Sequence, residues 1–168
     1  GAHTPGNSPG LQDFGSDLTY SGGSSTLVWE LGANTAAPGD RGTLFDGLNV
    51  GGNLDFAGST SATITFNGLG STVDWSDALW GSNQEWLVYD VAGTTNNFGN
   101  LGLIVDDWAD SNGALFNTVL SGASFGFTQL GSDVYLNYNF GGVIPEPSRI
   151  VLLALGVLGI FFRRRRKI

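Results

Sequence analysis

Hydrophobic and polar residues alternate with a period of two along much of the chain from residue 26 onward. Leu27, Trp29 and Leu31 alternate with more polar neighbours, and Ala62–Phe66 repeats the pattern most regularly. This period is typical of β-strands with one face in a core. Between residues 26 and 142, only Ser111–Val119 is compatible with a short helix. The pattern predicts strands at 26–31, two within 44–56, and others at 62–66, 86–91, 101–105, 124–129 and 134–140.

Glycine separates these predicted strands. Runs such as Gly51-Gly52 interrupt the alternation where tight turns need positive φ angles. The chain contains 27 glycines, eleven Phe and five Trp, and only 13% of its residues are charged. A disordered acidic chain would lack these aromatic residues. The composition therefore indicates an all-β domain of short strands and many turns.

The arrangement of the predicted strands has two interpretations. Short strands separated by 8–12 residues fit a β-sandwich, whereas short Gly/Asn/Ser turns also fit a parallel β-helix. We find no strict internal period, and we favour a short β-helix, with the sandwich as the alternative. Residues 44–56, 62–66 and 127–138 resemble rungs and closing strands in the passenger domains of autotransporter-type surface proteins. This resemblance implies a β-helix.

The chain divides into three parts. Residues 1–25 are rich in Gly, Ser and Pro, and we expect a flexible leader with one short edge strand near Asp17–Ser21. Residues 26–142 form the predicted β domain. Residues 143–168 differ from both because they combine prolines, an apolar run and a basic end.

Charge is distributed unevenly along these parts. Residues 1–144 carry a net charge of −13, with Arg41 as their one basic residue, and residues 145–168 carry +5. A domain this acidic will not bind nucleic acid by neutralising phosphates. The charge fits a domain that stays soluble outside the cell.

An uncharged apolar run fills residues 150–162. Its thirteen residues span about 20 Å as a helix, against about 30 Å for a hydrocarbon core, so alone it also fits a buried core helix. Flanking arginines can snorkel to the interface and lengthen the span. We therefore predict a transmembrane helix at 149–162, with a cytoplasmic basic tail. The tail contains Arg163, Arg164, Arg165, Arg166 and Lys167.

A proline-rich motif precedes the apolar run. Pro145 and Pro147 keep Glu146 extended, which suits binding by a processing enzyme, although prolines also simply end domains. The order Pro145-Glu146-Pro147-Ser148, apolar span and arginine run resembles the PEP-CTERM sorting signal of biofilm-forming Gram-negative bacteria. The resemblance implies recognition by the membrane enzyme exosortase, an inner-membrane export intermediate with the N-terminal domain outside, and a mature surface or matrix protein.

Residues for common catalytic chemistry are scarce. His3 is the only histidine and there is no cysteine, so a histidine triad, a histidine-rich zinc site and thiolate chemistry are not expected. We find no nucleophile elbow, phosphate loop or dinucleotide fingerprint. We therefore expect a protein that is not an enzyme and needs no cofactor.

Tryptophans beside carboxylates suggest an alternative function. Indole rings stack on sugars and carboxylates bind sugar hydroxyls, so these segments also fit a carbohydrate-binding or glycan-cleaving module, with exopolysaccharide as the partner. The competing interpretation is that the rings fill the core and the carboxylates cap turns. Exposed rings in one groove would favour sugar binding. The candidate residues are Trp75, Trp80, Trp86, Trp108, Asp74 and Asp77, with Glu85 and Asp90 as a further carboxylate pair.

A second acidic segment, at residues 106–110, is a candidate cation site. Asp106, Asp107 and Asp110 supply the hard oxygen ligands that Ca²⁺ prefers. Aligning Gly113 with the glycine of an EF-hand loop places Trp108 at the first ligand position, which excludes that loop. A looser surface Ca²⁺ site at the three aspartates remains as an expectation.

Overall fold

The computed structural model of the chain describes residues 1–5, 9–23 and 25–142. Within these ranges the regular structure is mostly strand and the helices are short, which confirms the all-β prediction. The helical turns are η1 (Pro38–Asp40), η2 (Ala78–Gly81), η3 (Phe98–Asn100) and α1 (Phe116–Val119).

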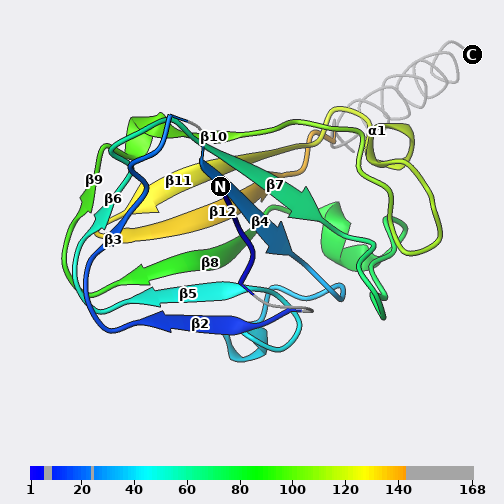
Figure 1. Cartoon of the computed structure of the whole chain (residues 1–168). Helices are drawn as coiled ribbons and strands as arrows, with labels where there is room; N and C mark the ends of the chain where they lie inside the picture. The colour runs from blue at the N-terminus through cyan, green and yellow to red at the C-terminus, as the bar shows by residue number, and fades with distance from the viewer. Residues whose placement is uncertain (6–8, 24, 143–168) are drawn as a thin grey trace, which may run out of the picture.

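The strands form three sheets, here called sheets A, B and C (Figure 1). Sheet A has the order β1-β4-β7-β10, sheet B the order β11-β12-β8-β5-β2, and sheet C the order β3-β6-β9. Sheet A contains β1 (Ala2–His3), β4 (Ser25–Glu30), β7 (Thr60–Thr65) and β10 (Leu101–Leu103). Sheet B contains β2 (Leu11–Phe14), β5 (Gly47–Val50), β8 (Gln84–Val91), β11 (Ser124–Leu130) and β12 (Asp133–Asn139), and sheet C contains β3 (Leu18–Thr19), β6 (Leu54–Asp55) and β9 (Thr95–Asn96).

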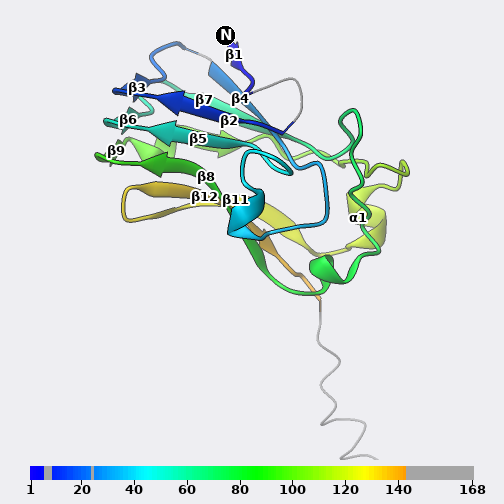
Figure 2. The same ribbon diagram turned by 90° about the horizontal axis from the view of Figure 1, so that it is seen from below.

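Strands β2 to β10 visit sheets B, C and A in the same order three times. Each of these strands pairs in parallel with the strand three places along the chain. In sheet B, Asp13 pairs with Asn49 and Asn49 with Asp90. Figure 2 shows β3, β6 and β9 stacked one above another at one side. Successive passes of the chain therefore place corresponding residues side by side.

The turns between sheets B and C also stack. The carboxylate of Asp17 accepts the N–H of Asn53, and the side-chain oxygen of Asn53 accepts the N–H of Thr94. In the turn after sheet C, a Cβ on Gly58 would overlap the carbonyl oxygen of Gly22. Side-chain oxygens and close backbone contacts thus join the turns of consecutive passes.

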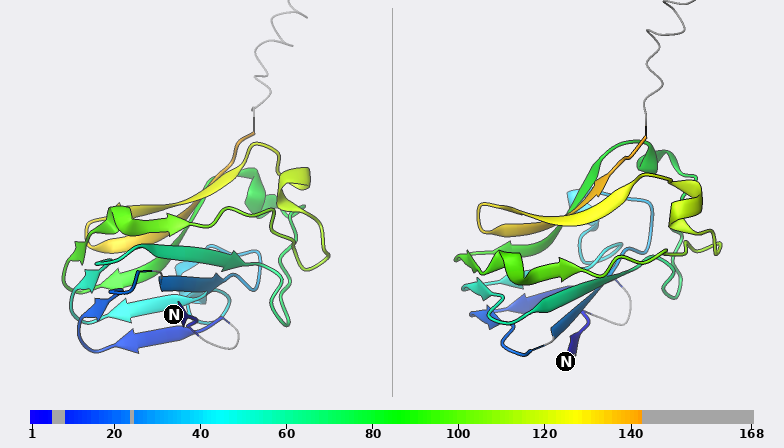
Figure 3. Two further views of the ribbon diagram at one scale, coloured as in Figure 1. Left: turned by 45° about the horizontal axis from the view of Figure 1, so that its top comes forward. Right: turned by 90° about the horizontal axis from the view of Figure 1, so that it is seen from above.

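An antiparallel hairpin completes sheet B. Strands β11 and β12 pair along their whole length around a turn in which Gly131 has a φ of +64°. Strand β12 then pairs with β8, with a register shift between Val134 and Tyr135. The hairpin lies beside sheet A, because β11 contacts β10 (Figure 3).

Residues 1–25 differ from the expected flexible leader. They contain β1, β2 and β3, and β3 overlaps the expected edge strand. The scattered apolar residues are strand positions: Phe14 pairs with Val50 and Leu18 with Leu54. These short strands gain order from pairing with the next pass rather than from their own sequence.

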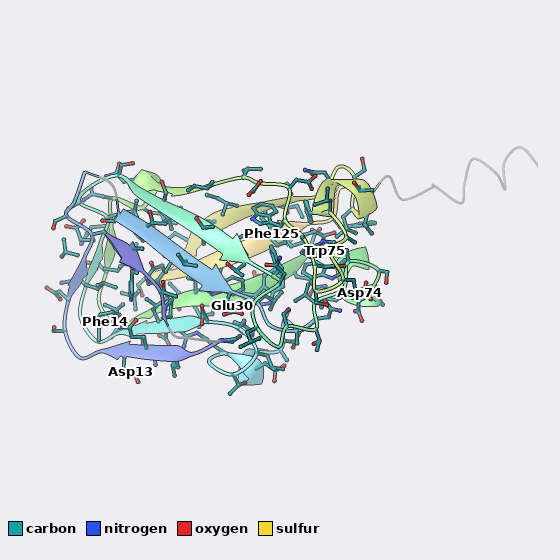
Figure 4. The ribbon with its side chains drawn as sticks, turned by 45° about the vertical axis from the view of Figure 1, so that its right-hand side comes forward. Asp13, Phe14, Glu30, Asp74, Trp75 and Phe125 are labelled. Atoms are coloured by element: carbon teal, nitrogen blue, oxygen red, sulfur yellow. The ribbon has the colours of Figure 1, made fainter. Side chains whose placement is uncertain are left out.

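The core is continuous and rich in aromatic rings. Alternation in β4 and β7 buries Leu27 and Trp29 beside Ala62 and Ile64. Loops at one end of the sheets contribute further rings, among them Trp75, which is labelled in Figure 4 and packs against the rings of Phe66 and Phe116. At the opposite end Tyr20 stacks on Phe56, with ring centroids 5.5 Å apart.

Candidate functional site

The candidate glycan-binding tryptophans all lie in the core. Trp75, Trp80 and Trp86 are each 1% exposed, and Trp108 is 7% exposed. The rings of Trp75 and Trp80 pack edge to face with centroids 4.8 Å apart. The indole N–H groups of Trp75 and Trp86 donate to the backbone carbonyls of Ala114 and Thr35. No face of these rings is open to a sugar, so the prediction that they bind glycan is wrong.

The two aspartates beside these tryptophans shape turns. The carboxylate of Asp74 accepts the N–H and the hydroxyl of Ser76, and these hydrogen bonds lower the pKa of Asp74. The carboxylate of Asp77 accepts the N–H of Leu79 and caps η2. Both carboxylates therefore stabilise the loop that inserts Trp75 and Trp80 into the core.

The three aspartates of the expected Ca²⁺ site are divided by burial. Asp110 is buried, and its carboxylate accepts the backbone N–H groups of Trp75 and Ala114. Asp106 and Asp107 are exposed. In the part of the chain that the structure describes, no group of three or more His, Cys, Asp or Glu residues is placed to hold a metal ion. Asp110 instead ties the Trp108 loop to the Trp75 loop.

The outer face of β8 and β12 carries two adjoining hollows, here called the outer trough. One hollow has a volume of about 440 Å³ and the other about 290 Å³, and Ala36 and Glu85 line both. Strand residues that point away from the core form the floor, and residues 36–45 form one wall. Further lining residues include Asn83, Asn137 and Asn139 in the larger hollow and Arg41, Leu87 and Tyr135 in the smaller one.

Polar groups in the outer trough are left without partners. Within the described residues, the carboxylate of Glu85, the hydroxyl of Tyr135 and the amide of Asn139 make no hydrogen bond to other groups. Burial, followed by the charge of Asp133, raises the pKa of Tyr135, so its hydroxyl stays protonated at neutral pH. The trough therefore presents both hydrogen-bond donors and acceptors to solvent.

Among the described residues, Arg41 is the one basic residue that lines the outer trough. Its guanidinium donates to the carbonyl oxygens of Leu87 and Leu48 at 2.9 and 2.8 Å and to Oδ1 of Asn49 at 2.6 Å. Burial lowers its pKa, whereas the nearby carboxylates of Asp90 and Asp13 raise it. Most of its N–H groups are held by the protein, and nearby carboxylates offset its charge, so Arg41 offers little to an anionic ligand.

A third hollow, of about 490 Å³, lies between the first strands of the three sheets. His3 there hydrogen-bonds to Gln12 and Tyr20, at 2.6 and 2.8 Å, and the hydroxyl of Tyr20 hydrogen-bonds to that of Tyr89. Burial raises the pKa of Tyr20 to about 12 and that of Tyr89 well above its ordinary value. Both hydroxyls stay protonated at neutral pH, and the network links residues of β1, β2 and β8 through Tyr20.

The sequence contained a signal for the trough that sequence reasoning missed. Tyr135, Asn137 and Asn139 alternate with the core residues of β12 and so had to lie on its outer face. Their neighbours across the ladder are Leu87 and Glu85, and this pairing is not visible in a local pattern. His3 lies in the segment that was expected to be a flexible leader, and no sequence pattern predicted its hydrogen bonds to Gln12 and Tyr20.

The predicted sorting residues, 145–148 and 163–167, lie outside the described residues, as does the predicted span 149–162. Among the described residues, the structure contains no helix long and apolar enough to cross a membrane.

The chain matches the family model of the PEP-CTERM protein-sorting motif over residues 143–166. No curated protein and no solved structure matches the chain. Motifs of this kind are recognised by exosortase, so the chain is an exported protein with a surface or extracellular mature form. The match covers the end of the chain alone, and the resemblance of the β domain to autotransporter passengers stays a prediction.

Proposed function

We propose that the chain is a non-enzymatic structural protein of the cell surface or extracellular matrix of a biofilm, sorted and processed by exosortase. The observation that carries this proposal is the sorting motif at 143–166, which begins four residues after β12 ends at Asn139. The motif therefore follows directly on the folded domain, so processing there would release the domain intact.

The proposed shape of the domain is a short parallel β-helix. Three features support it: the repeated order of sheets B, C and A, the parallel pairing of every third strand, and the hydrogen-bonded stack of Asp17, Asn53 and Thr94. Repeated units that contact their neighbours make a stiff, elongating scaffold. A scaffold of this kind suits a structural role at a cell surface.

The proposed route passes through the inner membrane. The uncharged run at 150–162 acts as a temporary anchor, and the cations at 163–167 stay on the cytoplasmic side. The acidic domain stands on the outer side, where its net charge of −13 keeps it soluble.

A reporter fusion tests the sorting proposal. Residues 143–168 are fused to a reporter that has its own export signal, in a host with exosortase and in the same host without it. We expect release of a shortened reporter only where exosortase is present, and retention of a matched fusion carrying Pro145→Ala and Glu146→Ala. An uncleaved, membrane-bound or cytoplasmic reporter in the exosortase host contradicts the proposal.

A further inference from the structure

We propose that the outer trough binds a glycan chain that carries no acidic groups. The two hollows adjoin at Ala36 and Glu85 and together follow the outer face of β8 and β12. The hollow of about 440 Å³ lies within the range of small-ligand sites and the hollow of about 290 Å³ lies at its lower limit, and the shared lining residues join them into one longer site. Of the buried tryptophans, Trp86 borders the smaller hollow, whereas Trp75, Trp80 and Trp108 line neither hollow. The site is independent of the sorting proposal.

The backbone of the trough floor is already paired. Strand β8 pairs with β5 on one side and β12 on the other, and β12 also pairs with β11. An extended peptide binds a sheet mainly by adding backbone hydrogen bonds at a free edge. Because β8 and β12 are interior strands, a ligand on this floor must be recognised by side chains. This observation disfavours a peptide.

The side chains of the trough match sugar hydroxyls. The carboxylate of Glu85 accepts hydrogen bonds, the hydroxyl of Tyr135 both donates and accepts, and the amides of Asn137 and Asn139 add donors. Oδ1 of Asn137 accepts the hydroxyl of Thr128, which fixes its amide and leaves the NH₂ group for a ligand. A sugar hydroxyl also donates and accepts, so one sugar ring can bridge several of these groups.

An apolar platform lies between these polar groups. Tyr135 and Leu87 are paired across the β8–β12 ladder, and both line the smaller hollow with partly exposed side chains. A ring beside an aliphatic side chain forms a surface on which the C–H face of a sugar can stack. The trough therefore combines stacking with hydrogen bonding on neighbouring positions.

Charge selects among glycans. Glu85 lies in the trough, and Asp90 and Asp133 stand close enough to Tyr135 to raise its pKa. The guanidinium of Arg41 is held by carbonyl and amide oxygens of the protein. The carboxylates of Asp90, Asp13 and Asp133 lie near Arg41 and outweigh its single positive charge, so a uronic-acid or sulfated chain would meet net repulsion. The ligand we infer is neutral.

Titration calorimetry of the full chain, in a detergent without a sugar headgroup, tests this inference. The probes are cello-, malto- and N-acetylchito-hexaose, an acidic galacturonate hexamer and an uncharged peptide. We expect at least one neutral hexasaccharide to bind, Tyr135→Ala to weaken it about tenfold or more, and Asn137→Ala to weaken it about two- to tenfold. Asn67→Ala, an exposed asparagine outside the trough, should leave affinity unchanged.

Three results would overturn the inference. The first is no heat from any neutral hexasaccharide at about 10 mM, a concentration that detects even weak sites. The second is binding that Tyr135→Ala and Asn137→Ala leave intact while both variants melt like the wild type. The third is equal or tighter binding of the galacturonate hexamer or the peptide. None of these results bears on processing at 143–166, so the two proposals fail separately.

Discussion

Replacing Arg41 tests how the outer face of sheet B is held together. Arg41 is the one basic residue before position 149. Its guanidinium joins its own segment, residues 36–45, to strands β5 and β8. It donates to Leu87 of β8, to Leu48 and Asn49 of β5 and, at a longer 3.4 Å, to Val88. A Cβ placed on Gly47 would lie under 3 Å from the guanidinium, so this group packs directly on the start of β5.

The structure sets the size of the expected loss. A hydrogen bond to a charged group contributes about 1.5–3 kcal/mol when dehydrated, and Arg41 is only half-buried, so water replaces part of the loss. We expect Arg41→Met to lower the free energy of unfolding by about 2–4 kcal/mol. Arg41→Lys keeps the charge but loses the planar fork, so it should recover less than half of that loss.

The competing cause is charge balance. Arg41 lies near the carboxylates of Asp13, Asp90 and Asp133, and removing its charge adds repulsion among them. If repulsion dominated, Arg41→Lys would restore nearly all the stability, and high salt would rescue Arg41→Met. Urea unfolding followed by tryptophan fluorescence separates these cases, because all five tryptophans are buried. A loss below about 0.5 kcal/mol for Arg41→Met would refute the reasoning.

Three further predictions concern stability. Burial raises the pKa of Asp46 from 3.8 to about 6, so the protonated carboxyl stabilises the folded state fully below about pH 4, and this stabilisation is lost as the pH rises through 6. Urea unfolding at pH 4 to 7 should show the free energy of unfolding declining in the wild type and changing less with pH in Asp46→Asn. Gly58→Ala should destabilise the protein strongly, because the added Cβ would overlap the carbonyl oxygen of Gly22. Gly102→Ala is the control and should melt like the wild type, because its added Cβ would meet no heavy atom within 4 Å. Equal melting temperatures for the two variants would contradict the close contact between the stacked turns. Phe66 is 1% exposed, and its ring centroid lies 4.8 Å from that of Trp75. Phe66→Ala should therefore lower the free energy of unfolding, measured in urea, by about 3–5 kcal/mol, and Phe66→Leu should lower it clearly less. A loss of about 1 kcal/mol for Phe66→Ala would mean that the core is packed more loosely than the structure shows.

The strands with a strong local pattern were predictable from the sequence. Alternation located β4, β7 and β12, and the break at Gly51-Gly52 separated β5 from β6. These signals are local because a side chain's face depends only on its position along its own strand. The expected last strand ran to Phe140, one residue beyond β12.

Features that depend on pairing could not be read locally. Strands β2 and β3 carry few apolar residues, and their order comes from β5 and β6. A signal was present, since Gly15-Ser16-Asp17-Leu18 resembles Gly51-Gly52-Asn53-Leu54 in chemical type. Unequal spacing hid it, because Leu18, Leu54 and Thr95 are stacked partners at unequal separations along the chain. A gap of variable length defeats a search for a strict period.

The candidate functional residues were also predictable only where their signal is local in the sequence. The sequence located the sorting motif because its three parts are adjacent and ordered. The prediction for the tryptophans was wrong because the local sequence of a tryptophan beside aspartates is the same whether the ring faces water or the core. Burial of Trp75 and Trp80 depends on loops folding over sheets from distant parts of the chain. The trough likewise exists only because β8 and β12 are neighbours.

Mass spectrometry of the mature protein, purified from the surface and medium of an exosortase-bearing host, tests the central claim most directly. We predict that the mature chain contains β12 intact, ends near Pro145-Glu146-Pro147, and yields no peptide from the basic residues 163–167. A mature surface protein that still carries the apolar run and the arginines through Ile168 would contradict the account.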